Sequence, residues 1–192
     1  MSDRLWLLVD LGAKATLIAL LVFAVLNPDL PQFAGKAMAA RAFSYPFAAL
    51  VVPAGWWLFA RRRPFPFAVD VLIVSPFLID MAGNALNLYD TITWWDDANH
   101  FVNWALLTSA FVLGLRPFRL GALNAAFLGV GFGATTAILW ELMEYVTFIR
   151  DSPEVRTAYT DTLGDLALGL SGSVIAAILV VLVSRRRRTT EA

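Results

Sequence analysis

The chain has 192 residues, of which 59% are hydrophobic and 16% charged. Soluble proteins average roughly 45–50% apolar and about 25% charged residues, and a soluble core of this size cannot bury so large an apolar fraction. The composition therefore indicates an integral membrane protein. Fifteen basic residues balance fifteen acidic ones, which removes the electrostatic basis for nucleic-acid binding. Since the chain has no cysteine, disulfides, thiolate metal sites and cysteine nucleophiles are excluded.

Long apolar stretches predict six membrane-spanning helices, because each crossing needs about 20 mostly apolar residues. Residues 42–60, 120–140 and 166–184 carry no charge at all. We expect an all-α bundle in a single membrane domain over residues 1–192, with helices at about 5–26, 42–60, 67–89, 98–115, 120–145 and 162–184.

Charges and a proline interrupt two of these stretches. Asp10 and Lys14 lie four residues apart in the first helix, so they are expected to pair on one face. Because these charges and the distance to a cleavage-like sequence do not suit a signal peptide, an uncleaved first helix is favoured. In the third helix Pro76 removes a backbone donor, and a bend is expected just before Asp80.

The distribution of basic residues predicts that both termini are cytoplasmic, because cytoplasmic loops are rich in Lys and Arg. One side of the predicted bundle carries Arg4, Arg61, Arg62, Arg63, Arg116, Arg119 and Arg185 to Arg188. The other side carries only Lys36, Arg41, Arg150 and Arg156, all assigned to outer loops. The run from Arg185 to Arg188 is interpreted as a topology anchor that contacts anionic headgroups.

With this topology, the outer ends of the last four helices share most of the membrane-level acids. Asp96 and His100 are four residues apart, as are Asp161 and Asp165, while Glu141 and Glu144 are three apart, so each pair occupies one helix face. Small residues precede Glu141 at every fourth position: Ala125, Gly129, Gly133 and Ala137. Such a stripe is typical of a close helix contact, so Glu141 is expected to point into the bundle.

Acids grouped at membrane depth need protons, water or a metal ion, because an isolated carboxylate there costs about 2.5 to 3.5 kcal/mol. Oxygen ligands with one imidazole suit Mg²⁺, Mn²⁺, Zn²⁺ or Fe²⁺. The expected metal ligands are Asp96, His100, Glu141, Glu144, Asp161 and Asp165. The candidate catalytic residues are Asp96, His100, Glu141 and Asp161, and the candidate substrate-binding residues are Asp80, Asn84 and Asn103. Helix N-caps at Asp96 and Asp161, and interhelical hydrogen bonds from the asparagines, are the structural alternatives.

The same residues carry a resemblance to known membrane proteins. They form Asp-Asp-Ala-Asn-His at 96–100, Trp-Glu-Leu-Met-Glu at 140–144 and Asp-Thr-Leu-Gly-Asp at 161–165, followed by Gly169. From Asp96 onward the chain resembles the VanZ-like membrane proteins and, more closely, the YjdF-like group. VanZ-like patterns have Lys, Gln and Asn where this chain has Asp97, Glu144 and Asp165. The resemblance implies a small bacterial inner-membrane protein. Some VanZ-like members are linked to glycopeptide-antibiotic tolerance, but the missing lysine weakens that link here.

Several functions fit this pattern. The leading hypothesis is a metal-dependent membrane enzyme or lipid-binding protein that acts on a phosphorylated lipid of the outer leaflet. The alternative is a proton- or cation-coupled transporter in which the same carboxylates bind ions. An intramembrane aspartyl protease is a weaker hypothesis, based on Tyr89-Asp90 and Gly164-Asp165, and a structural subunit is the fourth. Membrane lipid is the expected partner, and a homo-oligomer is left open.

Overall fold

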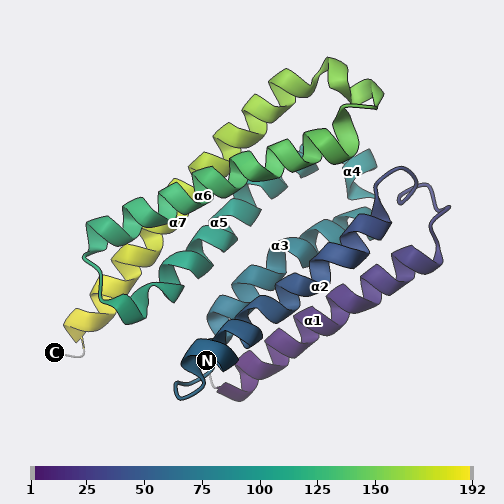
Figure 1. The fold of residues 1–192 in the computed structure, drawn as a ribbon. Coiled ribbons are helices and arrows are strands. Elements are labelled where there is room, and N and C mark those ends of the chain that lie inside the picture. The colour runs from purple at the N-terminus through teal and green to yellow at the C-terminus, as the bar shows by residue number, and fades with distance from the viewer. Residues whose placement is uncertain (1–2, 191–192) are drawn as a thin grey trace. The chain divides into compact units, whose positions relative to one another are not determined.

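The computed structural model describes residues 3–190, apart from the side chains of residues 3, 148, 154 and 185–190. Every regular element in this described part is a helix, which confirms the all-α prediction (Figure 1). Within the described residues, six helices are long and apolar enough to cross a membrane. They are α1 (Asp3–Leu26), α2 (Met38–Gly55), α3 (Phe67–Ala85), α5 (Trp95–Gly114), α6 (Ala122–Glu144) and α7 (Ala158–Thr190). The side chains of Arg185 to Arg188, interpreted above as an anchor, lie outside the described residues.

The start of α2 and the end of α3 differ from the predicted helix ends. Helix α2 begins at Met38, four residues before the predicted start, so Arg41 belongs to a helix and not to a loop. Helix α3 ends at Ala85 because Asn87 adopts a left-handed conformation with φ 58°, which a continuing helix cannot accommodate. The short helix α4 (Leu88–Thr91) follows.

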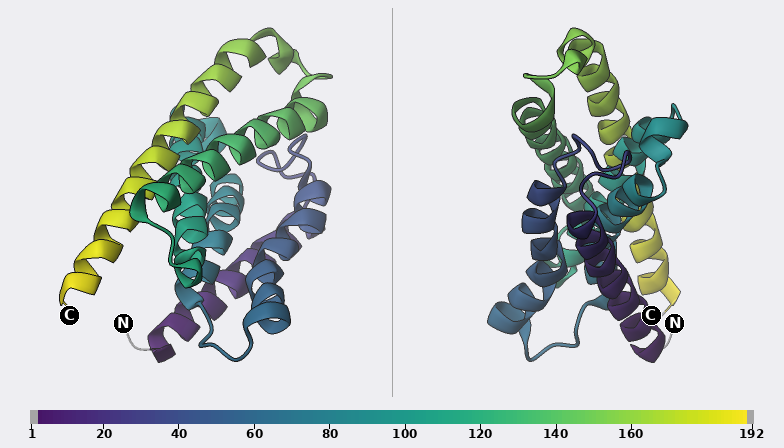
Figure 2. Two further views of the ribbon diagram at one scale, coloured as in Figure 1. Left: turned by 60° about the vertical axis from the view of Figure 1, so that its left-hand side comes forward. Right: turned by 90° about the vertical axis from the view of Figure 1, so that its right-hand side faces the viewer.

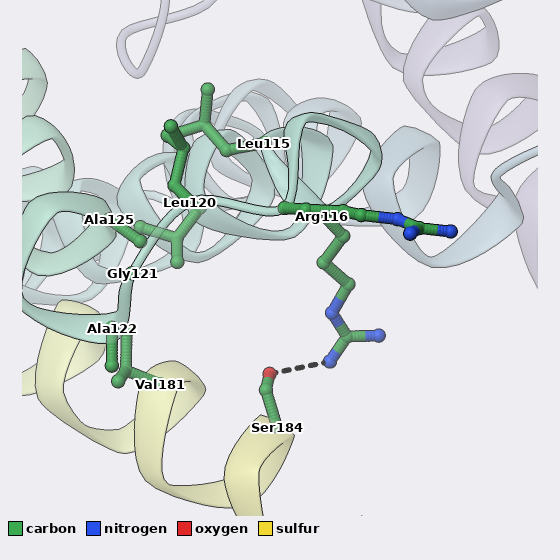
Figure 3. A pocket seen from close by; sticks show the side chains of 10 residues that line it. Leu115, Arg116, Leu120, Gly121, Ala122, Ala125, Val181 and Ser184 are labelled. Carbon is green, nitrogen blue, oxygen red and sulfur yellow. Dashed lines mark hydrogen bonds between the residues drawn. The ribbon is translucent and has the colours of Figure 1, made fainter. Parts of the chain in front are cut away.

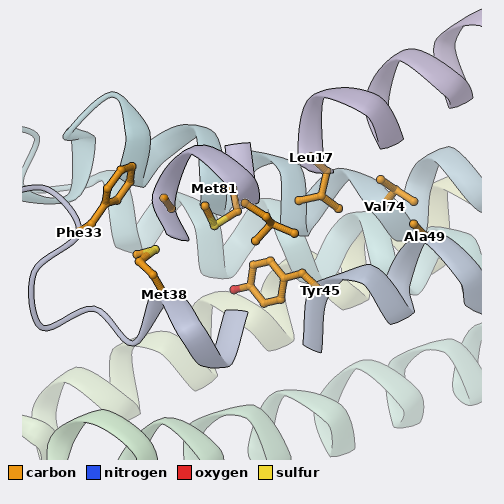
Figure 4. Packing of buried hydrophobic residues seen from close by; sticks show 9 residues of the cluster. Leu17, Phe33, Met38, Tyr45, Ala49, Val74 and Met81 are labelled. Atoms are coloured by element: carbon orange, nitrogen blue, oxygen red, sulfur yellow. The ribbon is translucent and has the colours of Figure 1, made fainter. Parts of the chain in front are cut away.

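The chain divides into two compact units, which are described separately. Helices α1 to α4 form the first unit, and α5, α6 and α7 form the second. In the first unit α1, α2 and α3 pack against one another around an apolar core (Figure 4). Leu17 of α1, Tyr45 of α2, and Val74 and Met81 of α3 are buried there. The single domain stays a prediction.

The second unit is held together by close helix contacts at small residues. Helices α6 and α7 form an antiparallel pair joined by residues 145–157 (Figure 2). Gly133 of α6 lies so close to Ser173 of α7 and Thr108 of α5 that a Cβ atom would collide with both side chains. Gly129, Gly133, Ala137 and Glu141 are the buried residues of α6, which confirms that the predicted stripe ends in an inward-facing carboxylate.

Candidate functional site

His100 of α5 lies between carboxylates from the other two helices of its unit. Its Nδ1 atom is 3.4 Å from Glu141 Oε1 of α6, and its Nε2 atom is 3.6 Å from Asp165 Oδ1 of α7. Asp96, one turn earlier on α5, approaches Nε2 at 3.8 Å. The imidazole therefore has carboxylate oxygens on both of its nitrogen sides.

These side chains form two overlapping groups whose candidate ligand atoms lie within 4.8 Å of one another. The first group is Asp96, His100 and Asp165, and the second is His100, Glu141 and Glu144. Five of the six predicted metal ligands are thus brought together within one unit. The sixth, Asp161, is exposed and belongs to neither group among the described residues, because it lies a full turn before Asp165 on α7.

The two sides of the imidazole differ in the solvent exposure of the carboxylates beside them. The side chains of His100, Glu141 and Asp165 are 7%, 5% and 5% exposed, whereas that of Asp96 is 54% exposed. The Nε2 side can therefore be reached through Asp96. The Nδ1 side is closed by Glu141, which is buried, and by Glu144, which is half-buried.

One buried oxygen in this group has no hydrogen-bond donor among the described residues. This atom is Glu141 Oε1, which faces His100 Nδ1. A neutral imidazole carries one N–H donor and one acceptor nitrogen, so it can donate to one of its two carboxylate sides only. The other nitrogen remains available as a ligand.

Asn103 lies one turn after His100 on α5. It is half-buried, and its Oδ1 atom has no hydrogen-bond partner in the described part of the chain. Its predicted role in substrate binding stays a prediction.

Asp80 and Asn84 belong to the first unit, where Asp80 has a set of partners of its own. Arg41 Nε donates to Asp80 Oδ2 at 2.8 Å, and the hydroxyls of Tyr45 and Tyr89 donate to its two oxygens at 2.7 and 2.9 Å. Asn84 Nδ2 donates to the Asp80 carbonyl at 2.9 Å. The assignment of Arg41 to an outer loop is therefore wrong, and Asp80 has a basic neighbour that was not expected.

Sequence reasoning missed three members of this cluster: Arg41, Tyr45 and Tyr89. The spacing of Arg41 and Tyr45 by four residues could have placed them on one helix face. Nothing in the spacing pointed to Asp80 as their partner, which lies 39 residues beyond Arg41. Whether Asp80 and Asn84 share a pocket with the second unit stays a prediction.

Another polar feature of the second unit lies at the end remote from His100. A cavity of about 290 Å³ is lined mainly by the segment 115–121 that joins α5 to α6, together with the last turn of α5, the first turn of α6, and Val181 and Ser184 of α7 (Figure 3). Arg116 donates to Ser184 Oγ at 2.8 Å beside it. This cavity is separate from the carboxylate–histidine cluster, so it is no part of the candidate metal site.

The six candidate spans define the class of protein: it is an integral membrane protein. Comparison with known families specifies it further: the chain belongs to the DUF2238 family of predicted membrane proteins, whose pattern matches residues 10–186. It is 32% identical over 117 residues to an uncharacterized protein of Thermotoga maritima. That match covers 57% of this chain and 59% of the relative. No solved structure matches the chain.

Proposed function

We propose that this protein binds a divalent metal ion at the carboxylate–histidine cluster of α5, α6 and α7. The observation that carries the proposal is the position of His100, whose two nitrogens each lie 3.4 to 3.6 Å from a buried carboxylate oxygen of another helix. Carboxylate oxygens with one imidazole are a donor set that suits Mg²⁺, Mn²⁺, Zn²⁺ or Fe²⁺.

The charge of the cluster supports a cation. The described ion pairs of Glu141 and Asp165 are with His100, whose single imidazole cannot balance several carboxylates. Leaving a buried charge without compensation is costly at membrane depth. A divalent ion would neutralise two carboxylates and would supply the partner that Glu141 Oε1 lacks, either directly or through the imidazole.

We assign the ion to the Nε2 side of His100. On this side Asp96 and Asp165 would complete the protein ligands, and the exposure of Asp96 gives water and substrate access. Nδ1 would then carry the proton and donate it to Glu141. Ligating histidines usually have such a carboxylate partner, which holds the ring and raises the basicity of the ligating nitrogen.

The substrate class that we propose is a phosphorylated lipid. A bound divalent ion polarises phosphoryl oxygens and lowers the proton affinity of a bound water. Glu144, half-buried and close to His100, is the candidate general base. If both termini are cytoplasmic, as the arginine distribution predicts, the cluster lies near the outer leaflet. The VanZ-like and YjdF-like resemblance concerns these same three helices and agrees with a bacterial inner membrane.

A coupled transporter is the second candidate. Besides the cluster, two aspartates of the first unit, Asp10 and Asp70, are buried within candidate spans. Buried acids of this kind mark ion and proton paths in membrane proteins. Ion flux into proteoliposomes that is abolished by Glu141→Gln would favour the transporter over the enzyme.

Metal analysis of the purified protein tests the proposal. We expect about one divalent ion per chain when the protein is purified without chelator, and loss of that ion in His100→Ala and Asp165→Asn. Asp97→Asn is the matched control, because Asp97 is exposed, adjacent to Asp96 and outside both described groups. Equal metal content in the wild type and His100→Ala, or none in either, would overturn the proposal.

A further inference from the structure

A second buried charged group lies in the first unit, between α1 and α3. Lys14 Nζ of α1 is 3.1 Å from Asp10 Oδ2 of the same helix and 2.5 Å from Asp70 Oδ2 of α3. The pair of Asp10 and Lys14 confirms the expectation from their spacing, while Asp70 is an additional partner 56 residues away. We refer to Asp10, Lys14 and Asp70 as the triad.

The triad is buried inside candidate membrane spans. The side chains of Asp70 and Asp10 are 0% and 4% exposed, and that of Lys14 is 17% exposed. Two ionised carboxylates with one ammonium would leave a net charge of −1 in this position. An uncompensated charge that is buried at this depth is strongly disfavoured.

The carboxylate oxygens show where the missing positive charge belongs. Lys14 donates to the Oδ2 atom of each aspartate. Asp10 Oδ1 and Asp70 Oδ1 are buried and have no hydrogen-bond partner among the described residues, and the two carboxyl groups are neighbours because both contact the same ammonium. Two carboxylates are both acceptors, so they can form a hydrogen bond only if one of them is protonated.

The number of available ligands favours a proton over a metal ion. Calcium takes about six to eight oxygen ligands and magnesium requires an octahedral shell, whereas the triad offers two uncommitted oxygens beside an ammonium that repels cations. A single proton needs only one donor oxygen and one acceptor oxygen. Arg41 is the basic residue of α2, and it forms an ion pair with Asp80, which is not a member of the triad.

We propose that the triad is a binding site for one proton, which Asp10 and Asp70 share through a hydrogen bond. The proton converts one carboxylate into a carboxylic acid, and no other bond changes. The triad then consists of one ammonium, one carboxylate and one carboxylic acid, so its net charge is zero. This inference does not depend on the metal proposal, because the triad lies in the first unit and the candidate metal ligands lie in the second. With cytoplasmic termini, the site would exchange its proton on the cytoplasmic side, through the exposed part of Lys14.

Asparagine variants test the proposal by charge balance. An asparagine has nearly the shape of a protonated aspartate and donates a hydrogen bond from its amide, so Asp10→Asn or Asp70→Asn makes the triad neutral without a proton. We expect each single variant to melt within about 3 °C of the wild type, and the double variant, which leaves Lys14 unpaired, to lose at least about 6 °C. Asp151→Asn, at an exposed position, is the control. Single variants as unstable as the double one would contradict the proposal, since that result requires two ionised carboxylates.

Infrared spectroscopy tests the same claim without relying on stability. Aspartates labelled with ¹³C should show a protonated carboxyl band in the wild type, and both Asp10→Asn and Asp70→Asn should lower its intensity by one carboxyl group. Asp151→Asn, at an exposed position, should leave it unchanged. A wild-type spectrum without this band, or a band of undiminished intensity in both triad variants, would overturn the proposal.

Discussion

Replacing Glu141 by glutamine should weaken metal binding without abolishing it. In the assignment above, Glu141 accepts a hydrogen bond from His100 Nδ1, 3.4 Å away, and does not touch the ion. Loss of such an outer partner typically costs 10- to 100-fold in metal affinity, or about 1.4 to 2.7 kcal/mol. Loss of a direct ligand, as in Asp165→Asn, should cost far more.

Competition with a fluorescent metal chelator in detergent would measure both affinities. Glu144→Gln is the matched control, because Glu144 lies in the same group but is placed outside the ligands and outside the imidazole hydrogen bond. An affinity of Glu141→Gln equal to that of the wild type would refute the hydrogen bond. A loss as complete as in His100→Ala would show that Glu141 is itself a ligand, so the ion would belong to the Nδ1 side.

Three further predictions concern stability. Arg41→Met should lower the free energy of unfolding by about 3 to 5 kcal/mol, because it leaves the buried Asp80 without its cation, and a second change to Asp80→Asn should recover part of the loss in a double-mutant cycle. Gly172→Ala should cost about 1 to 3 kcal/mol in thermal unfolding, because its Cβ would meet the Phe101 carbonyl, whereas Gly164→Ala on the same helix has open space and should be neutral or stabilising. Addition of a strong chelator should lower the melting temperature of the wild type and leave that of His100→Ala unchanged, since only a protein that binds the ion is stabilised by it.

Local patterns in the sequence predicted the helices and the faces on which polar residues lie. Apolar stretches located the six spans, and the small residues at every fourth position before Glu141 correctly oriented that side chain toward its neighbours. Spacing also placed Asp96 with His100. These are properties of single helices, which the 3.6-residue period determines.

The contacts between distant helices could not be predicted in the same way. Arg41 and Asp80 are 39 residues apart, and Lys14 and Asp70 are 56 apart, so no periodicity links them. Arg41 was assigned to a loop because the uncharged stretch begins directly after it, whereas α2 begins at Met38. Asp161 shares a helix face with Asp165 but lies one turn nearer the N-terminal end of α7, where it is exposed. A helix face shows the direction of a side chain and not the depth of its surroundings.

The metal environment itself is the most direct test of the account. Protein loaded with Zn²⁺ as a probe can be measured by X-ray absorption at the zinc edge. We predict one imidazole nitrogen together with carboxylate or water oxygens at about 2.0 to 2.2 Å, and loss of the imidazole signal in His100→Gln. A shell of oxygens alone that is the same in both proteins would contradict a metal centre built around His100.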